Sequence, residues 1–107
     1  MFDRNERIAE YLKKHHTGKK NAASSHELEA VFHLRGSKLR RQINALRCNG
    51  NPICSDKEGY YFAANKEELA ATIMQLNSRI SKMTKAKKGL IKAILDFDGD
   101  IQIIIPI

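Results

Sequence analysis

Residues 27–62 constrain the fold of this chain more than any other segment, ELEAVFHLRGSKLRRQINALRCNGNPICSDKEGYYF. A short helix comes first, with an apolar side formed by Leu28, Val31 and Phe32. A tight corner at residues 33–36, a helix with a basic outer face and a β-hairpin then follow in order. This order predicts a mainly α fold with a small β part (α+β).

The helix after the corner, expected over about residues 36–48, has two contrasting faces. Leu39, Ile43 and Leu46 are spaced i, i+4, i+7 and predict a buried stripe. Residues 35–49 contain five basic residues and no acid, whereas a solvated surface helix usually mixes both signs. The side opposite the buried stripe, with its flanks, holds Ser37, Lys38, Arg40, Arg41, Asn44 and Cys48.

A hairpin is predicted directly after this helix. Asn49-Gly50 closes the helix with a left-handed cap, and Pro52 prevents its extension. Residues 53–55 and 60–62 are two short strands around a loop at residues 56–59, with Lys57 at its tip. A corner, a basic helix and a hairpin are typical of a winged helix-turn-helix, whose second helix fits the DNA major groove.

The residues before this segment complete the expected winged-helix domain, residues 1–64. Ile8, Tyr11 and Leu12 predict one face of a helix at residues 5–16, and residues 17–21 break it. Ser24 or Ser25 provides the N-cap of the next helix.

The charge distribution favours a polyanionic partner. The chain of 107 residues has a formal net charge of +7, and residues 1–92 carry +10 because residues 93–107 hold three acids and no base. No nucleophile–base pair, paired carboxylates or phosphate loop is found, so we do not expect an enzyme. The four histidines lack metal-ligand spacing with Cys48 and Cys54, so neither a metal nor another cofactor is expected. Free thiols and the lack of a long apolar span favour the cytoplasm over a membrane.

A long amphipathic helix is expected over residues 65–95, capped by Asn65. Its apolar residues alternate in steps of four and three, which is the heptad pattern of a seam between two chains. The alternative is one amphipathic helix packed on its own domain. We expect a homodimer through Leu69, Ile73, Leu76, Ile80 and Met83, with Leu90 and Ile94 continuing the seam after Lys87.

Residues 96–107 combine an acidic stretch with an apolar one. Asp96, Asp98 and Asp100 have the spacing of a calcium loop, but Ile101 and Ile107 replace its Gly and Glu, so we reject a metal site. The isoleucines in residues 101–105 predict a short terminal strand after an acidic turn.

Residues 27–65 hold a set of residues that carries a family resemblance, namely Glu27-Leu28, Leu39-Arg40-Arg41, Ile43, Leu46-Arg47, Gly50, Pro52-Ile53-Cys54-Ser55 and Gly59-Tyr60-Tyr61-Phe62. In these residues the chain resembles the small winged-helix proteins of phages and prophages of Gram-positive bacteria. More distantly, it is similar to the DNA-binding domain of the biotin operon repressor. The resemblance implies DNA binding in transcription regulation or phage replication, in the cytoplasm of a bacterial host. Two positions depart from the family: His33 replaces the usual Gly of the corner, and Arg35 replaces the usual Ser or Thr cap.

The expected function is therefore binding of duplex DNA, as a transcriptional regulator or a phage replication accessory factor. The alternative is a protein-interaction module that recruits a replication or transcription partner. Residues 96–101 resemble the acidic partner-recruiting tail of bacterial single-stranded DNA-binding proteins, which gives this alternative a second surface at residues 96–107. The residues expected to contact DNA are Ser37, Lys38, Arg40, Arg41, Asn44 and Arg47 on the helix, Lys57 on the hairpin, and Lys19 and Lys20.

Overall fold

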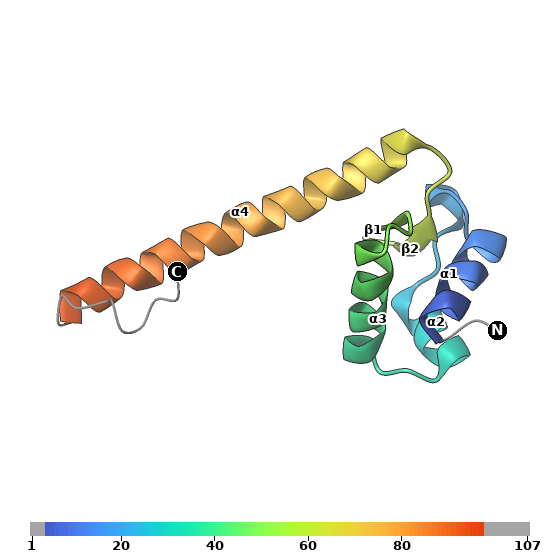
Figure 1. Cartoon of the computed structure of the whole chain (residues 1–107), viewed down its shortest axis with the longest axis horizontal. Coiled ribbons are helices and arrows are strands. Elements are labelled where there is room, and N and C mark those ends of the chain that lie inside the picture. The colour runs from blue at the N-terminus through green and yellow to red at the C-terminus, as the bar shows by residue number, and fades with distance from the viewer. Residues whose placement is uncertain (1–3, 98–107) are drawn as a thin grey trace. The chain divides into compact units, whose positions relative to one another are not determined.

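The computed structural model describes the backbone of residues 4–97 and the side chains of residues 6–97. The fold is mainly helical, with one small antiparallel sheet. Its two compact units meet between Ile73 and Met74, so the last helix begins in the first unit and continues in the second. In chain order the elements are α1 (Arg4–His15), the 3-10 helix η1 (Lys19–Asn21), α2 (Ser25–Phe32), α3 (Gly36–Cys48), β1 (Ile53–Asp56), β2 (Gly59–Phe62) and α4 (Lys66–Phe97) (Figure 1).

The core of the first unit forms where α1, α2, α3 and β1 bring their apolar stripes together. The predicted stripe of α3 is confirmed, since Leu39, Ile43 and Leu46 are at most 2% exposed. Ile8 and Leu12 of α1 are fully buried, as their spacing predicted. Each such side chain contributes about 1.5–3 kcal/mol by leaving water. This burial fixes which face of α3 remains outside.

The apolar side of α2 is narrower than expected. Ser24 caps it, because its Oγ accepts a hydrogen bond from the Glu27 N–H at 3.1 Å. Leu28 is fully buried and Phe32 partly buried, but Val31 is 42% exposed, so our expectation for Val31 was wrong. Leu28 and Phe32 lie four residues apart on one face, and Val31, 100° before Phe32, turns away from the core.

The corner between α2 and α3 contains a residue in the left-handed conformation. His33 ends α2 in the left-handed conformation, with φ 53° and ψ 48°. Arg35 occupies the N-cap position of α3, and its side chain makes no capping hydrogen bond. The first turn of α3 therefore has no side-chain cap at its N–H groups.

The hairpin is longer than predicted, because Asp56 and Gly59 also pair across the strands. Its second strand is bonded to the segment between α1 and α2. Tyr60 and Ala23 exchange two backbone hydrogen bonds, of 2.7 and 2.8 Å, and Thr17 bridges Phe62. These bonds attach the hairpin to the helical core.

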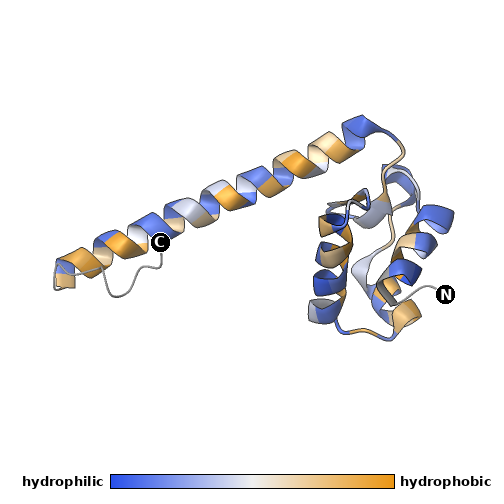
Figure 2. Cartoon of the chain, in the orientation of Figure 1, coloured by the Kyte–Doolittle hydropathy of each residue, from blue (hydrophilic) through white to orange (hydrophobic). Residues whose placement is uncertain are grey.

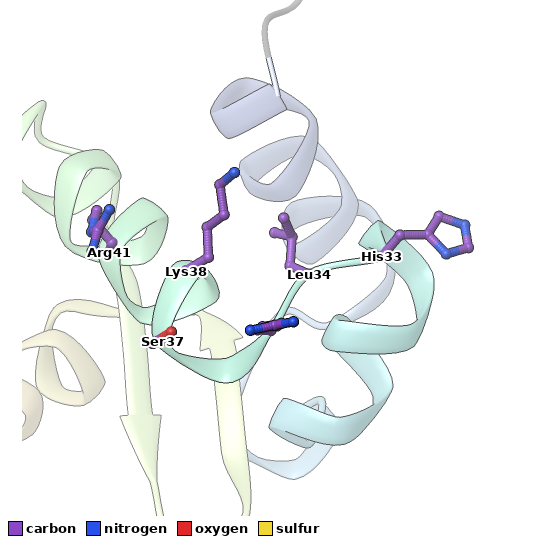
Figure 3. Close-up of a pocket in the computed structure, with 6 residues that line it drawn as sticks. His33, Leu34, Ser37, Lys38 and Arg41 are labelled. Carbon is purple, nitrogen blue, oxygen red and sulfur yellow. The ribbon is translucent and has the colours of Figure 1, made fainter.

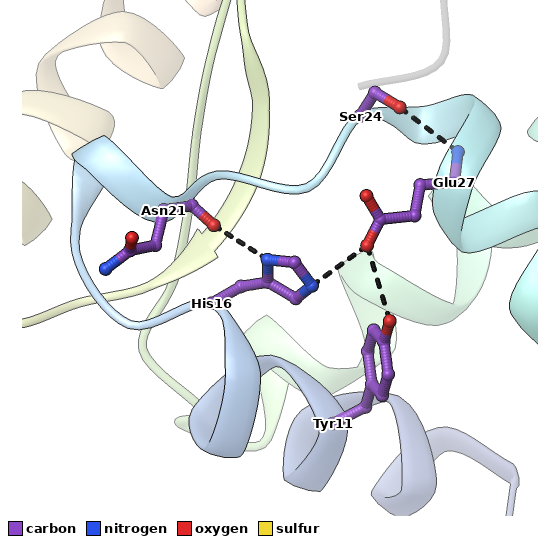
Figure 4. A network of polar contacts seen from close by, with 5 residues as sticks. All are labelled: Tyr11, His16, Asn21, Ser24 and Glu27. Carbon is purple, nitrogen blue, oxygen red and sulfur yellow. Dashed lines mark hydrogen bonds and ion pairs between the residues drawn. The ribbon is translucent and has the colours of Figure 1, made fainter.

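A polar network joins α1 to the start of α2 (Figure 4). The Nε2 atom of His16 lies 2.9 Å from Oε2 of Glu27, and its Nδ1 lies 2.7 Å from the carbonyl oxygen of Asn21. The hydroxyl of Tyr11 donates to the same Glu27 oxygen at 3.3 Å. Burial, and after it the Glu27 carboxylate, raises the pKa of Tyr11. The network thus links α1 and the segment after it to the first turn of α2.

The helix α4 starts as predicted and ends later. The Oδ1 atom of Asn65 accepts a hydrogen bond from the Glu68 N–H at 2.9 Å. At the other end the helix includes Asp96 and Phe97, so the expected turn does not begin at Asp96. The strand predicted at residues 101–105 lies outside the described residues. In the described part of the chain, no helix has the length and apolarity needed to cross a membrane.

Candidate nucleic-acid interface

The outer face of α3 gathers most of the residues expected to contact DNA. Because Leu39, Ile43 and Leu46 point into the core, Arg40, Arg41 and Asn44 between them face solvent. The helix holds four basic residues and no acidic one. All six of the residues predicted on this face are exposed, namely Ser37, Lys38, Arg40, Arg41, Asn44 and Cys48.

A shallow hollow lies at the start of α3, beside the corner (Figure 3). Its lining comes from the corner and from the first two turns of α3, so the left-handed turn at His33 determines its shape. Three of its residues, Arg35, Lys38 and Arg41, are cationic at neutral pH. The lining consists of His33, Leu34, Arg35, Ser37, Lys38 and Arg41.

One acidic side chain reaches this end of α3. The Glu29 carboxylate of α2 and the Arg40 guanidinium each have an atom 3.5 Å from the position that a Cβ on Gly36 would take. Glu29 therefore lowers the positive potential near Gly36 and Arg40. Arg41 and Asn44 lie further along the helix.

Arg47 does not lie with the other predicted contacts. It is partly buried, its Nε donates to the carbonyl oxygen of Ile53 at 2.8 Å, and its Nη2 donates to Oγ of Ser55 at 3.0 Å. The guanidinium joins the last turn of α3 to β1. Periodicity placed Arg47 near the basic face but gave no sign of these bonds.

The predicted lysines outside α3 lie near acidic residues. Lys57 is exposed in the turn between β1 and β2. Lys19 and Lys20 line a second hollow together with Glu27 and Glu58. The backbone N–H of Lys19 also donates to Oε2 of Glu68 at 2.9 Å. This surface has mixed charge, so it favours phosphate less than the outer face of α3 does.

The two cysteines have different surroundings. Cys48 is exposed at the end of α3, whereas Cys54 is buried in β1. Burial raises the pKa of the Cys54 thiol, which keeps it neutral and unreactive. Among residues 6–97, no group of three or more His, Cys, Asp or Glu side chains is arranged to hold a metal ion.

The residues of the predicted dimer seam are exposed to solvent to different degrees. Ile73, Ile80 and Met83 are 51%, 60% and 72% exposed, whereas Leu69 and Leu76 are partly buried. Apolar and polar residues alternate along the whole of α4 (Figure 2). The single chain thus leaves most of this stripe in water.

Sequence reasoning missed three residues of the hollow and one buried polar group. His33, Leu34 and Arg35 were recognised as corner residues but not as part of the candidate interface. Thr72, 3% exposed, accepts a hydrogen bond from the Ser55 N–H at 3.4 Å. A threonine on an amphipathic helix carries no local signal for such a contact.

Comparison of the chain with protein-family models, curated proteins and solved structures finds no match.

Proposed function

We propose that this chain binds double-stranded DNA as a winged helix-turn-helix, with α3 in the major groove. The observation that carries the proposal is the outer face of α3. It presents Ser37, Lys38, Arg40, Arg41 and Asn44 to solvent, on a helix without an acid whose other face is fixed in the core.

The chemistry of this face matches the edges and backbone of a duplex. Arginine bonds guanine through two parallel hydrogen bonds, and asparagine bonds adenine in the same way. Arg41 and Asn44 lie three residues apart, so they are neighbours on the helix surface. Lys38 and Ser37, in the first turn, are suited to phosphate oxygens.

The start of α3 adds a second favourable feature. No side chain caps its first turn, and the N-terminus of a helix carries a partial positive charge. A phosphate in the hollow beside the corner would meet these N–H groups together with Arg35 and Lys38. Such a contact would orient α3 without reading sequence.

The hairpin serves as the wing in this proposal. Two backbone hydrogen bonds between Tyr60 and Ala23 attach the hairpin to the helical core and so restrict the turn that carries Lys57. Lys57 then contacts the DNA backbone, and Lys19 and Lys20 contribute less because Glu27 and Glu58 share their surface.

Fluorescence anisotropy with a labelled duplex at several salt concentrations tests the proposal. We expect the logarithm of the affinity to fall linearly with the logarithm of salt concentration, with a slope of about −0.9 per phosphate contacted. Arg41→Ala should weaken binding by about 1–3 kcal/mol. Arg7→Ala, which removes the same charge from an exposed position on α1, is the matched control and should have a much smaller effect.

Two outcomes would contradict the proposal. One is affinity for duplex DNA that does not depend on salt. The other is equal weakening by Arg41→Ala and Arg7→Ala, because binding would then follow net charge and not the face of α3. Selection of bound duplexes from a random pool then measures the sequence preference. A transcriptional regulator needs such a preference, whereas a non-specific replication accessory does not.

A further inference from the structure

The apolar stripe of α4 follows a heptad from Ile73, the last residue of the first unit, to Phe97. Writing the heptad as a to g, position a is Ile73, Ile80, Lys87 and Ile94, and position d is Leu76, Met83, Leu90 and Phe97. All eight residues lie within one uninterrupted helix. Isoleucine at a with leucine at d is the combination that favours two parallel strands.

We propose that α4 binds a second copy of this chain as a parallel two-stranded coiled coil, in which Lys87 specifies register and strand number. The pairing does not depend on DNA, and it goes beyond the proposed function.

The stripe spans about three and a half heptads, so it offers a continuous seam for a second helix. From Ile73 to Phe97 it extends about 36 Å, at 1.5 Å per residue. On a helix about 10–12 Å across, it covers roughly 400 Å² in projection. Stable protein pairs begin at about 600 Å² of accessible surface per chain, and side chains that interdigitate bury more than their projection. Ile80, Met83, Leu90 and Phe97 are the most exposed residues of the stripe, at 60–89%, and supply much of this area.

The charges are also compatible with self-pairing. The lysines of this segment other than Lys87 occupy positions b, c and f, which face away from a partner helix. In a parallel pair, position g of one chain faces position e of the next heptad in the other, which places Arg79 beside Thr84 and Ala86 beside Ile91. Neither contact joins two charges of one sign. The outward-facing lysines are Lys82, Lys85, Lys88 and Lys92.

Lys87 is the one polar residue among these eight positions. In the parallel register, Lys87 of one chain lies opposite Lys87 of the second, and both side chains can extend out of the seam into water. In the antiparallel register that aligns Ile73 with Leu90, each Lys87 would instead lie against an apolar Leu76. A single lysine at position a costs stability and specifies one arrangement.

Sedimentation of the full-length chain tests the pairing. We expect the mass of a dimer for the wild type and of a monomer for Ile80→Asp, with the first unit still folded by circular dichroism. Ser81→Asp adds the same charge at the neighbouring outer position and should leave the dimer intact. The proposal is overturned if the wild type sediments as a monomer, or if the two variants behave alike. If the wild type is a monomer and binds vesicles of anionic phospholipid, the stripe binds a lipid surface and not a second chain.

Cysteine cross-linking in a Cys48→Ser background tests the orientation. Leu90→Cys should form a disulfide-linked dimer on oxidation, because the two residues 90 meet across a parallel seam. In the antiparallel register they would lie about 25 Å apart. Cross-linking of Ile73→Cys chains with Leu90→Cys chains, and not of Leu90→Cys with itself, would overturn the parallel arrangement.

Substitution of Lys87 tests its assigned role. Lys87→Ile should tighten association by about tenfold or more, and should allow species larger than a dimer. Lys88→Ile makes the same change at the neighbouring outer position and should leave the dimer mass unchanged. Equal effects of the two substitutions would show that general hydrophobicity, not the seam position, controls association.

Discussion

Arg47 donates a hydrogen bond from its Nε to the carbonyl oxygen of Ile53, over 2.8 Å. With a second bond to Ser55, it ties the end of α3 to the first strand of the hairpin. We therefore expect Arg47→Ala to lower the free energy of unfolding by about 1–3 kcal/mol, because it removes two bonds made by a charged donor. Urea denaturation measures this effect.

Arg40→Ala is the control for this prediction. Arg40 is exposed on the same helix, so its removal should change stability by no more than about 0.5 kcal/mol. If Arg47→Ala has the same urea midpoint of unfolding as the wild type, the bonds to the hairpin contribute nothing to stability. Arg47 would then be counted again among the candidate DNA contacts.

Asn44 and Lys38 should differ in what they contribute to DNA binding. Asn44, in the middle of the outer face of α3, is suited to a base edge, and Lys38, in its first turn, to phosphate. Asn44→Ala should relax the preference at one base pair. Lys38→Ala should weaken all duplexes equally and reduce the salt slope by about 1. Binding of a panel of single-base variants separates the two, and a uniform loss for Asn44→Ala would contradict its assignment.

Gly59 permits the close approach of the hairpin to the segment before α2. A Cβ at this position would overlap the carbonyl oxygen of Ala23 and lie 2.6 Å from its carbon, and the backbone has φ 142°. Gly59→Ala should therefore cost about 2 kcal/mol or more, since it combines steric overlap with a strained backbone. Thermal denaturation measures the loss.

Gly89 provides the opposite case. It lies within α4 with open space around its Cβ position, so Gly89→Ala should favour the helix by about 0.5–1 kcal/mol. Equal destabilisation by the two alanines would show that the contact with Ala23 does not restrict position 59.

Local periodicity accounts for most of the elements. The 3.6-residue spacing of Leu39, Ile43 and Leu46 predicted the buried and exposed faces of α3, and Asn49-Gly50 predicted its end. The α4 boundary at Asn65 followed from the same kind of signal, a capping residue with acids in the first turn. Such features depend on residues within one or two turns, which the sequence displays directly.

Contacts between distant segments were not predictable in this way. Lys19 and Glu68 are 49 residues apart, and no pattern indicates their hydrogen bond. Arg47 was grouped with the cations of the basic face, because the sequence does not distinguish an arginine that bonds to a neighbouring strand from one that is free to bind phosphate. Val31 was misplaced for a related reason, since the width of a buried face depends on which helices cover it.

Glu68 joins the start of α4 to the segment before α2 and should make stability depend on pH. Its Oε1 accepts from the Ala64 N–H and its Oε2 from the Lys19 N–H, both at 2.9 Å. The bond from Ala64, then the bond from Lys19, lowers the pKa of this carboxyl below its ordinary value of 4.5. A lowered pKa means that the folded state favours the carboxylate. The stabilisation is therefore complete well above pH 4.5 and is lost as the pH falls through the folded pKa.

Glu68→Gln should accordingly be less stable than the wild type at neutral pH, because a neutral amide oxygen accepts these bonds more weakly. The difference in melting temperature should shrink as the pH falls below the ordinary value of 4.5, where the wild-type carboxyl also becomes neutral. Glu67→Gln, an exposed neighbour in the same first turn, serves as the control and should follow the wild-type profile more closely. A difference for Glu68→Gln that is as wide at about pH 3 as at pH 7 would show that the loss comes from packing and not from the carboxylate charge.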